Sequence, residues 1–396
     1  MIKGHPFFMV MGFKRYLTYF FTILITLLLC IGGFNTLIDP FARYQWLTLA
    51  GINAEKTQVA ITGVRTLKAM MLAQGHYQAL ILGTSRANVG LDPKHPLLTE
   101  ATYNAALDGS NIYELEKVFD FAIRHNPELK LMIIALDFLT FSNQRTVNAD
   151  FAQSRFAAKP SWWTQLGHTL SVDESYYAIK TLWDNQSQRQ AAYQAIYTPN
   201  GLAKRRFPAT PRRLFRQILT QNFLVNRYTY AGFCYSMDRL ARLRRMLATA
   251  ERHHITVKLF ISPIHAWLLE TIRIMGLYPT YTQWQRDLTQ LLPLWDFSGY
   301  NAFTTETVTA NQPMRWYWDA SHYRRALGDI ILTQLLTAQG PSDFGVLIQQ
   351  TNIEAHLQHQ RQAQQRYQQR HAQDIALLER LAQHHRRHYS CPHAQS

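Results

Sequence analysis

The stretch QALILGTSR, residues 78–86, is the part of the sequence that indicates the fold most directly. Its apolar run is short and ends in Gly83, which is typical of a buried strand rather than of a helix. A weaker strand candidate follows at residues 101–104, and a third run, LKLMIIAL at residues 129–136, is almost unbroken in hydrophobicity. Parallel strands that are covered on both faces have this composition.

Helical patterns alternate with these strand candidates. Apolar residues recur at helical spacing between them, and Asn126-Pro127 ends one of the helices. The pattern predicts helices over residues 64–73, 112–125, 236–253, 281–292 and 324–336, and further strands over residues 255–262 and 294–297. Strands that alternate with helices imply a parallel sheet with right-handed crossovers. We therefore predict the α/β class, with flanking helices around a parallel sheet.

The N-terminal region contains a segment that is long enough to cross a bilayer. Residues 16–38, YLTYFFTILITLLLCIGGFNTLI, carry no charge and would form roughly 34 Å of helix. Lys14 and Arg15 precede this run and Asp39 follows it, so the positive-inside rule predicts a cytoplasmic N-terminus. We expect a single-pass anchor of the inner membrane, with the rest of the chain on the periplasmic side. A cleaved signal peptide is the alternative, but no small-x-small site follows the run.

Composition narrows the class of protein further. The 396 residues are 47% hydrophobic, which allows a sizeable core and excludes wholesale disorder. The net charge of +15 would suit nucleic acid, anionic lipid or an acidic polymer. Export makes nucleic acid the least favoured of these partners. Cys30, Cys234 and Cys391 are too few and too scattered for a disulfide framework or a zinc site. Whether Cys234 and Cys391 pair stays open, and we expect no cofactor.

We expect three parts along the chain. They are an anchor over residues 1–40, an α/β domain over residues 41–344 with a mainly helical insertion at about 140–235, and a Gln/His/Arg-rich extension over residues 345–396. The insertion carries six positive charges with no acid between them, at Lys204, Arg205, Arg206, Arg212, Arg213 and Arg216. These charges suit either a solvated, membrane-facing surface or a site for an acidic glycan.

The extension predicts a polar helix over about residues 352–389, which we interpret as a solvent-exposed appendage or a partner-binding helix. Its histidines lack the repeated spacing and carboxylate support of a built metal site. They are His356, His359, His371, His384, His385, His388 and His393.

Two short segments carry residues suited to catalysis. Ser85 follows the first predicted strand, where a side chain projects above the carboxyl ends of the strands, the edge at which open α/β sheets bind ligands. Asp319 precedes His322 by three residues, so its carboxylate can reach Nδ1 and leave Nε2 free to take a proton from serine. Each segment alone also fits plain helix capping. Together they predict a nucleophile, a base and an orienting carboxylate in one α/β layer.

These segments resemble the first and last blocks of the SGNH (GDSL-like) hydrolase superfamily. YNAALDGS at residues 103–110 resembles the segment with the second-block glycine, and LMIIALDF at residues 131–138 falls where the third-block strand is expected. The resemblance implies a flavodoxin-like sheet and a catalytic triad of Ser85, His322 and Asp319. It also implies that the backbone N–H groups of Ser85 and Gly109 bind the oxyanion.

The chain departs from this family in the third block, where Asp137 replaces the usual asparagine. A carboxylate would repel a developing oxyanion, so either Asn104, Asn111 or Asn143 completes the hole or only two backbone donors remain. Asp137 is alternatively structural. Arg86, Asn111, Asp137 and His265 are the candidate substrate or oxyanion contacts.

An N-terminal anchor before such a domain is similar to the exported SGNH-like proteins of alginate O-acetylation and teichoic-acid D-alanylation. The resemblance implies a membrane-anchored acyltransferase or esterase acting on O-acyl groups, chiefly O-acetyl, of an extracytoplasmic polysaccharide. A membrane-bound O-acyltransferase would then be its partner. The alternative is a non-catalytic assembly or glycan-binding protein. An extracytoplasmic nucleic-acid binder rests on charge alone.

Overall fold

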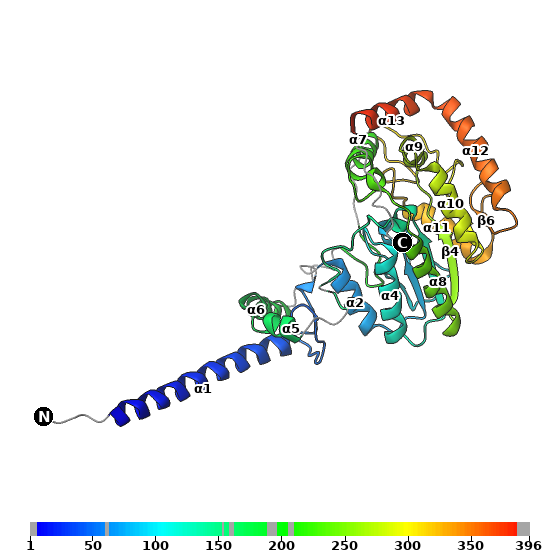
Figure 1. Cartoon of the computed structure of the whole chain (residues 1–396). Coiled ribbons are helices and arrows are strands. Elements are labelled where there is room, and N and C mark those ends of the chain that lie inside the picture. Colours follow the sequence, from blue (N-terminus) through cyan, green and yellow to red (C-terminus); the bar gives the residue numbers. More distant parts are fainter. Residues whose placement is uncertain are drawn as a thin grey trace. The chain divides into compact units, whose positions relative to one another are not determined.

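A computed structural model describes most of the chain (Figure 1). The described residues are 6–59, 63–152, 154–157, 162–187, 196–204 and 210–385. The chain divides into two compact units, one made of residues 1–67 and 153–194 and the other of residues 68–152 and 195–396. The region expected to be an insertion thus contributes to both units. The domain boundaries expected from the sequence stay a prediction.

The second unit is built on a six-stranded sheet. Its strands are β1 Ala79–Leu82, β2 Thr102–Asn104, β3 Leu131–Leu136, β4 Thr256–Ile261, β5 Leu294–Asp296 and β6 Val346–Ile348. The order is β2-β1-β3-β4-β5-β6, with the first five parallel and β6 antiparallel to β5. The predicted α/β class with a parallel sheet is confirmed. The sequence analysis missed β6 because its apolar run, Val346–Ile348, is only three residues long.

The order of the strands reverses between β1 and β3. From β1 the chain moves outward to β2 and then returns across β1 to β3. In open α/β sheets, ligands bind in the crevice at such a reversal, outside the carboxyl ends of the strands. Leu82 at the end of β1 pairs with Ile134 near the end of β3. The residues that follow these two strands are therefore neighbours at the edge where a site is expected.

Helices cover the sheet. They are α2 Val64–Gln74, α3 Ser85–Gly90, α4 Ile112–His125, α8 Met237–Arg252, α9 Ala266–Ile274, α10 Tyr278–Thr289 and α11 Arg325–Thr337. α4 and α8 pack against each other in front of the sheet in Figure 1. The five predicted helices are present within a few residues of the expected bounds. The analysis missed α9 because the helix has only nine residues, too few to show a clear helical period.

A cluster of aromatic rings joins the loop segments to this core. Phe138 begins the short helix η2 Phe138–Phe141, and its ring stacks on that of Phe233 with centroids 4.1 Å apart. The ring of Phe138 also meets Tyr281 and Trp284 of α10 edge-on or tilted. Such packing holds the chain just beyond the carboxyl end of β3. The neighbouring segments are α7 Pro211–Ile218, η4 Leu219–Leu224 and η5 Tyr230–Gly232.

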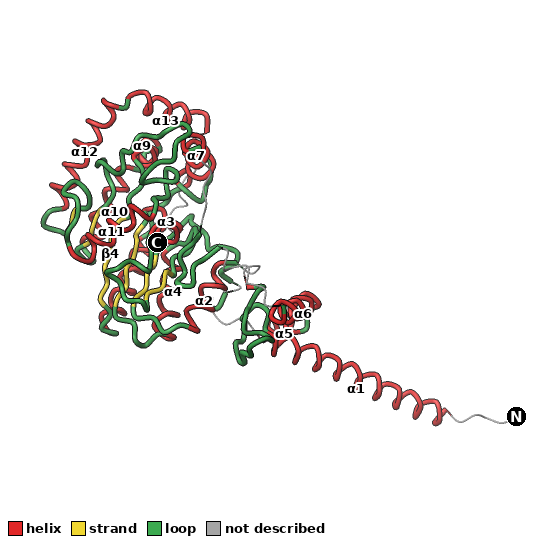
Figure 2. The backbone as a smooth tube through the Cα atoms, turned by 180° about the vertical axis from the view of Figure 1, so that it is seen from behind, coloured by secondary structure: helices red, strands yellow, loops and turns green. Residues whose placement is uncertain are grey.

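The C-terminal region differs from its prediction. It forms two helices, α12 Ile353–Arg370 and α13 Ala372–His385, rather than one, and residues 386–389 lie outside the described residues. It is not an exposed appendage, because α12 packs on α10 and α13 packs on α9 and η4 (Figure 2). His356 Nε2 lies 2.8 Å from Oδ2 of the buried Asp296, and Gln360 Nε2 donates to the same oxygen at 2.9 Å. The polar side chains of α12 thus satisfy a buried carboxylate, a role that residue composition does not reveal.

The first unit contains α1 Pro6–Ile38, α5 Trp162–Thr169 and α6 Val172–Gln186. The 27 residues of α1 over Gly12–Ile38 have a mean hydropathy of 2.2 in their most apolar window. This helix is long and apolar enough to span a membrane or to act as a signal sequence. The N-terminal apolar helix predicted from the sequence is confirmed at this level.

A buried lysine ties the second unit together beside the sheet. Lys68 is fully buried, and its ammonium group donates to Asn88 Oδ1 at 3.1 Å, to Gly201 O at 2.6 Å and to Asn104 O. Burial lowers the pKa of Lys68 to about 7, although the charge of Asp108 raises it in part. At pH 8, Lys68 is therefore largely deprotonated in the folded protein but still protonated in the unfolded chain.

This difference predicts a pH dependence of stability. Because the folded state binds fewer protons at Lys68 than the unfolded state above pH 7, the free energy of unfolding should rise with pH between about 7 and 9. The slope from this group is at most about 1.4 kcal/mol per pH unit. Urea unfolding of detergent-solubilised wild type and Lys68→Met at pH 7, 8 and 9 measures it. Equal slopes in the two proteins would contradict the prediction.

Candidate active site

Three side chains from distant parts of the second unit meet at the reversal point of the sheet. His322 Nε2 lies 2.8 Å from Ser85 Oγ, although the two residues are 237 positions apart in sequence. His322 Nδ1 lies 2.8 Å from Asp319 Oδ2 and 3.0 Å from Asp319 Oδ1. The structure thus brings together the hydroxyl, the imidazole and the carboxylate that the sequence analysis singled out.

The turn after β1 positions Ser85. Thr84 caps α3, since its side chain accepts from the backbone N–H of Arg86, and Ser85 is the first residue of the helix. Gly83 permits a close approach between this turn and β3. A Cβ at Gly83 would lie 2.8 Å from Cβ of Ala87 and 3.0 Å from Cβ of Ala135. A side chain at this position would push the serine away from the sheet.

The loop before α11 positions His322 through local hydrogen bonds. Asp319 Oδ1 accepts from the backbone N–H groups of Ser321 at 2.7 Å and His322 at 3.0 Å, an arrangement that aspartate often makes in turns. Burial alone would raise the pKa of Asp319, but the facing imidazole and the two backbone donors hold it below its usual range. Asp319 is therefore ionised at neutral pH and accepts from Nδ1 of His322.

Close packing of two helices holds the serine turn and the histidine loop together. α3 begins at Ser85, and α11 begins shortly after His322. A Cβ at Gly328 of α11 would lie only 1.8 Å from the carbonyl oxygen of Gly90, the last residue of α3. No larger residue fits at Gly328 without separating the helices, so this contact fixes the distance between the two elements that carry the site.

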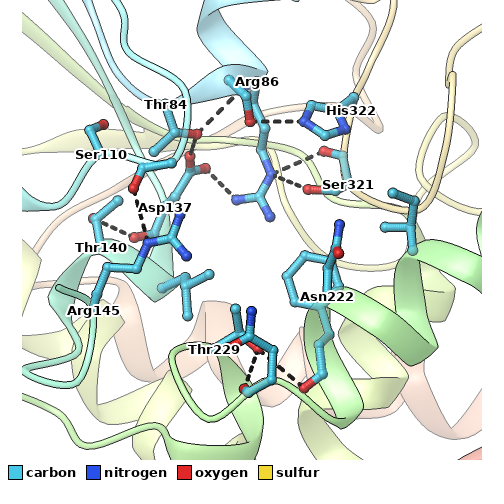
Figure 3. Close-up of a pocket in the computed structure, with 16 residues that line it drawn as sticks. Thr84, Arg86, Ser110, Asp137, Thr140, Arg145, Asn222, Thr229, Ser321 and His322 are labelled. Atoms are coloured by element: carbon cyan, nitrogen blue, oxygen red, sulfur yellow. Dashed lines mark hydrogen bonds and ion pairs between the residues drawn. The ribbon is translucent and has the colours of Figure 1, made fainter. Parts of the chain in front are cut away.

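A cavity of about 170 Å³, lined mainly by polar residues, lies in front of these residues (Figure 3). Figure 3 shows Arg86, Arg145, Asn222 and Thr229 around its centre. The cavity is lined by Thr84, Ser85, Arg86, Gly109, Ser110, Asp137, Leu139, Thr140, Arg145, Ile218, Asn222, Phe223, Asn226, Thr229, Ser321 and His322. Two guanidinium groups against one carboxylate make it attractive to anionic or strongly polar ligands.

A buried ion pair forms one wall of the cavity. Arg86 Nη1 lies 2.5 Å from Asp137 Oδ1, and the two residues are only 5% and 3% exposed. Arg86 Nε donates to the carbonyl oxygen of Ser321 at 3.0 Å, and the hydroxyl of Thr84 donates to Asp137. Burial would lower the pKa of Arg86, but the charge of Asp137 outweighs this and raises it. The negative charge of Asp137 is therefore compensated by Arg86, and its carboxylate already accepts hydrogen bonds from Arg86 and Thr84.

The structure does not bring the candidate asparagines into the cavity. Asn104 donates to the carbonyl oxygens of Ala87 and Leu91 at 2.8 and 2.9 Å. Asn111 caps α4, and its amide donates to Arg145 O at 2.9 Å. Neither of them lines the cavity, and Asn143 does not line it either. Gly109, the expected second backbone donor, does line it, with a positive φ of 65°.

His265 lies outside the cavity as well. It caps α9 by accepting from the backbone N–H of Trp267 at 3.2 Å, and its Nε2 lies 2.7 Å from the carbonyl oxygen of Glu306. Burial lowers the pKa of His265 to about 4, against a smaller opposing effect of that hydrogen bond. Its two ring nitrogens are thus engaged in holding the loops, and it has no contact with the cavity.

Several lining residues carried no signal in the sequence. Arg145, whose Nε donates to Gly109 O at 3.1 Å, lies in the loop after β3, and Asn222 lies in η4. Both fall within the region interpreted only as a helical cover, because no motif distinguishes them there. Thr84 and Ser110, by contrast, lie inside the motifs that were quoted. Among the described residues, no group of three or more histidine, cysteine, aspartate or glutamate side chains is arranged to hold a metal ion.

The Arg86–Asp137 pair predicts a large effect on stability. The Asp137→Ala variant leaves a buried guanidinium without its carboxylate, which should lower the free energy of unfolding by about 3 kcal/mol. The Arg86→Met/Asp137→Ala double variant removes the unpaired charge and should be more stable than Asp137→Ala alone. Urea unfolding followed by circular dichroism compares them. A double variant no more stable than the single one would argue against this electrostatic account.

The chain shows little similarity to known proteins. No protein-family model and no curated protein matches the chain. A solved structure described as "a putative platelet activating factor from Streptococcus pneumonia" is similar at 10% sequence identity, with a TM-score of 0.33. The match covers 72% of this chain and 92% of that chain. These comparisons assign the chain to no family.

Proposed function

We propose that this chain is a membrane-anchored, extracytoplasmic acyltransferase or esterase of SGNH type, acting on O-acyl groups of a polysaccharide. The observation that supports the proposal best is the pair of 2.8 Å contacts that link Ser85 Oγ to His322 Nε2 and His322 Nδ1 to Asp319 Oδ2. A serine hydroxyl is a weak nucleophile, and a base so placed and oriented is what activates it.

The proposed reaction passes through an acyl-enzyme. Ser85 Oγ attacks the carbonyl carbon of the acyl donor and transfers its proton to His322 Nε2. The tetrahedral intermediate then breaks its bond to the leaving oxygen, which takes the proton from His322. A sugar hydroxyl or a water next gives its proton to His322 and attacks the acyl carbon. The bond from that carbon to Ser85 Oγ then breaks, and Oγ takes the proton back from His322, which restores the free hydroxyl and the neutral imidazole. Asp319 stays ionised and stabilises the imidazolium that forms twice in this cycle.

The oxyanion of the intermediate would be held by backbone N–H groups of Ser85 and Gly109. Asp137 is no obstacle in this scheme, because Arg86 compensates its charge at 2.5 Å. The guanidinium of Arg86 also lines the cavity, and because its charge is balanced by Asp137, stabilisation of the oxyanion falls to the backbone donors. Loss of one oxyanion donor usually costs about 10²–10³ in rate. A site without the family's asparagine is therefore expected to react slowly or to depend on a particular donor.

The cavity favours a small acyl group. Its volume of about 170 Å³ suits an acetyl group and part of a sugar better than a fatty chain. Transfer is preferred over hydrolysis only by analogy with the anchored proteins that the sequence resembles. The same analogy makes a membrane-bound O-acyltransferase the proposed partner.

A second cavity supports a role in binding an acidic polymer. It measures about 500 Å³, and its lining includes Lys204, Arg315, Arg324 and Arg325. The guanidinium of Arg324 lies over the ring of Trp318, 4.1 Å from its centroid, so this wall combines positive charge with an aromatic face. An anionic glycan acceptor would suit it. The same cavity favours the alternative function, a glycan-binding assembly protein without catalysis.

The proposed location is the inner membrane, with the second unit on the periplasmic side. Lys14 and Arg15, which directly precede the uncharged segment of α1, support this orientation through the positive-inside rule. Cys234 is disulfide-bonded, which suits an oxidising compartment. Its pairing with Cys391 was left open by the sequence, and Cys391 lies outside the described residues.

The nucleophile is tested by covalent labelling. Purified wild-type protein treated with a fluorophosphonate or an activated acetyl ester should carry one adduct on Ser85 in peptide mass spectrometry. The Ser85→Ala variant should carry none, because the activated hydroxyl is absent. Ser342→Ala, at an exposed serine remote in sequence from the motifs, serves as the control and should label like wild type. An adduct on another serine, or none on folded wild-type protein, would contradict the assignment.

The orienting carboxylate is tested by Asp319→Asn. An amide at this position can donate to Nδ1 and so favour the wrong tautomer of His322, which should slow acylation of Ser85 by about 10³–10⁴ while the fold is retained. Stopped-flow acylation by an activated ester gives the rate, and circular dichroism checks the fold. A loss of less than about tenfold in a folded variant would mean that Asp319 does not orient the base.

Complementation in cells distinguishes the enzyme from the binding protein. Cells that carry Ser85→Ala should lose acylation of the polysaccharide if the proposed reaction occurs. Full retention of acylation would leave the glycan-binding alternative.

A further inference from the structure

We propose that α5 and α6 lie in the interfacial layer of the bilayer, where α1 leaves the membrane, with the apolar stripe of α6 in contact with lipid. The α6 stripe consists of Val172, Tyr176, Ile179 and Trp183. The proposal concerns the first unit and goes beyond the proposed reaction. It requires only that α1 remains attached and spans the membrane.

The α6 stripe is apolar and almost fully open. Its four residues are spaced by four, three and four positions, so they share one face of the helix. They are 83%, 61%, 61% and 66% exposed, respectively. A helix on a water-facing surface normally turns its apolar face inward and its polar face outward. α6 has the reverse arrangement.

The opposite face of α6 is polar and buried. Arg43 Nε lies 3.4 Å from Glu174 Oε1, and Asp184 Oδ2 accepts from Gln58 Nε2 at 2.9 Å. The amide of Asn185 donates to the carbonyl oxygen of Glu55 at 2.9 Å. These contacts fix which side of the helix faces the unit. The outward position of the stripe is therefore built in by specific partners and does not arise from a loosely placed helix.

α5 continues the apolar surface. Trp162, Trp163 and Leu166 are exposed, and the two indole rings stack with centroids 3.4 Å apart. Tryptophan and tyrosine combine an apolar ring with a polar group, so they concentrate at the boundary between lipid headgroups and hydrocarbon. Three exposed tryptophans and one exposed tyrosine on two short helices match that environment better than they match water.

Direct contacts hold the helix pair at the end of α1, as Figures 1 and 2 show. The amide of Asn35 in α1 donates to the carbonyl oxygen of Thr169 at 2.8 Å and to Ser175 Oγ at 2.9 Å. The end of α1 is capped as well, because the ammonium group of Lys56 donates to Ile38 O at 2.9 Å. The position of α1 in the bilayer therefore sets the depth of α5 and α6.

The length of α1 gives that depth. The uncharged segment begins at Tyr16, and Asn35 follows 19 residues later. At about 1.5 Å per residue this is about 28 Å, close to the roughly 30 Å thickness of the hydrocarbon core. Asn35 thus lies near the far boundary of the core. Helices that pack against Asn35 lie at the interface, the depth that suits their aromatic side chains.

Lipid is the occupant that these observations favour. A membrane protein that covers the α6 stripe would also explain its exposure, but it would have to occupy a surface that α1 already holds against the bilayer. Lipid needs no additional partner, and it suits both the aromatic composition and the depth. The two occupants give different outcomes in the experiment below.

The test uses the full chain in lipid nanodiscs of defined composition. In a Cys30→Ser background, Ile179→Cys or Trp183→Cys is labelled with an environment-sensitive fluorophore. We expect a blue-shifted emission, quenching by lipids that carry a spin label near the headgroup, and quenching by aqueous iodide that is several-fold weaker than at a control site. Met237→Cys is the control, because Met237 is an apolar residue of α8 with 62% exposure. The substituted side chains are exposed, so folding should be retained.

Wild-type protein provides a second measurement without any substitution. Hydroxyl-radical footprinting in nanodiscs should protect Trp163, Tyr176 and Trp183 and leave Met237 reactive. Labels at residues 179 and 183 that are as open to iodide as the control, together with unprotected tryptophans, would overturn the proposal. Protection that appears in native membranes but not in pure lipid would assign the surface to a protein partner and would overturn it too.

Discussion

The buried ion pair between Arg86 and Asp137 is the interaction on which the arrangement of the candidate site depends. Arg86 belongs to the turn after β1, Asp137 follows β3, and Arg86 also bonds to Ser321 in the loop that carries His322. One guanidinium therefore connects three segments that are far apart in sequence and adjacent at the reversal point of the sheet. A buried charge pair is strongly destabilised when one partner is lost. The pair therefore fixes the relative positions of these three segments as well as stabilising the fold.

The same pair changes the electrostatics of the proposed chemistry. A carboxylate at the end of β3 would oppose a developing oxyanion if it were free, but its charge is compensated by Arg86 and its oxygen accepts from Thr84. The cavity then presents the guanidinium of Arg145, the balanced Arg86–Asp137 pair and many neutral hydrogen-bonding groups to a ligand. A polar, oxygen-rich substrate suits such a lining. The proposed acyl transfer would thus rely on positioned charge where the family it resembles relies on an amide.

The first unit follows a different rule of burial. In the sheet unit, apolar residues are inside, as water requires. In α6, by contrast, Glu174, Asp184 and Asn185 are buried, whereas the apolar α6 stripe is exposed. Buried apolar residues in the sheet unit and exposed apolar residues on α6 are both favourable only if the sheet unit faces water and α6 faces an apolar environment. The long apolar helix α1 would offer the second of these, since it is long and apolar enough to span a membrane.

The sequence by itself determined the α/β class, the parallel strands, most of the helices and the apolar N-terminal helix, because these follow from local patterns of hydrophobicity. It also singled out Ser85, Asp319 and His322, since the turn after a strand and the Asp-x-x-His spacing are local features. The partner of Asp137, the engagement of Asn104, Asn111 and His265 elsewhere, and the contributions of Arg145 and Asn222 to the cavity came only from the tertiary structure. The polar contacts of α12 with Asp296 and the outward stripe of α6 belong to the same group. Each of these depends on which distant segments become neighbours. Residue spacing cannot report that, because a buried polar group is defined by the partner it finds and not by its place in the chain.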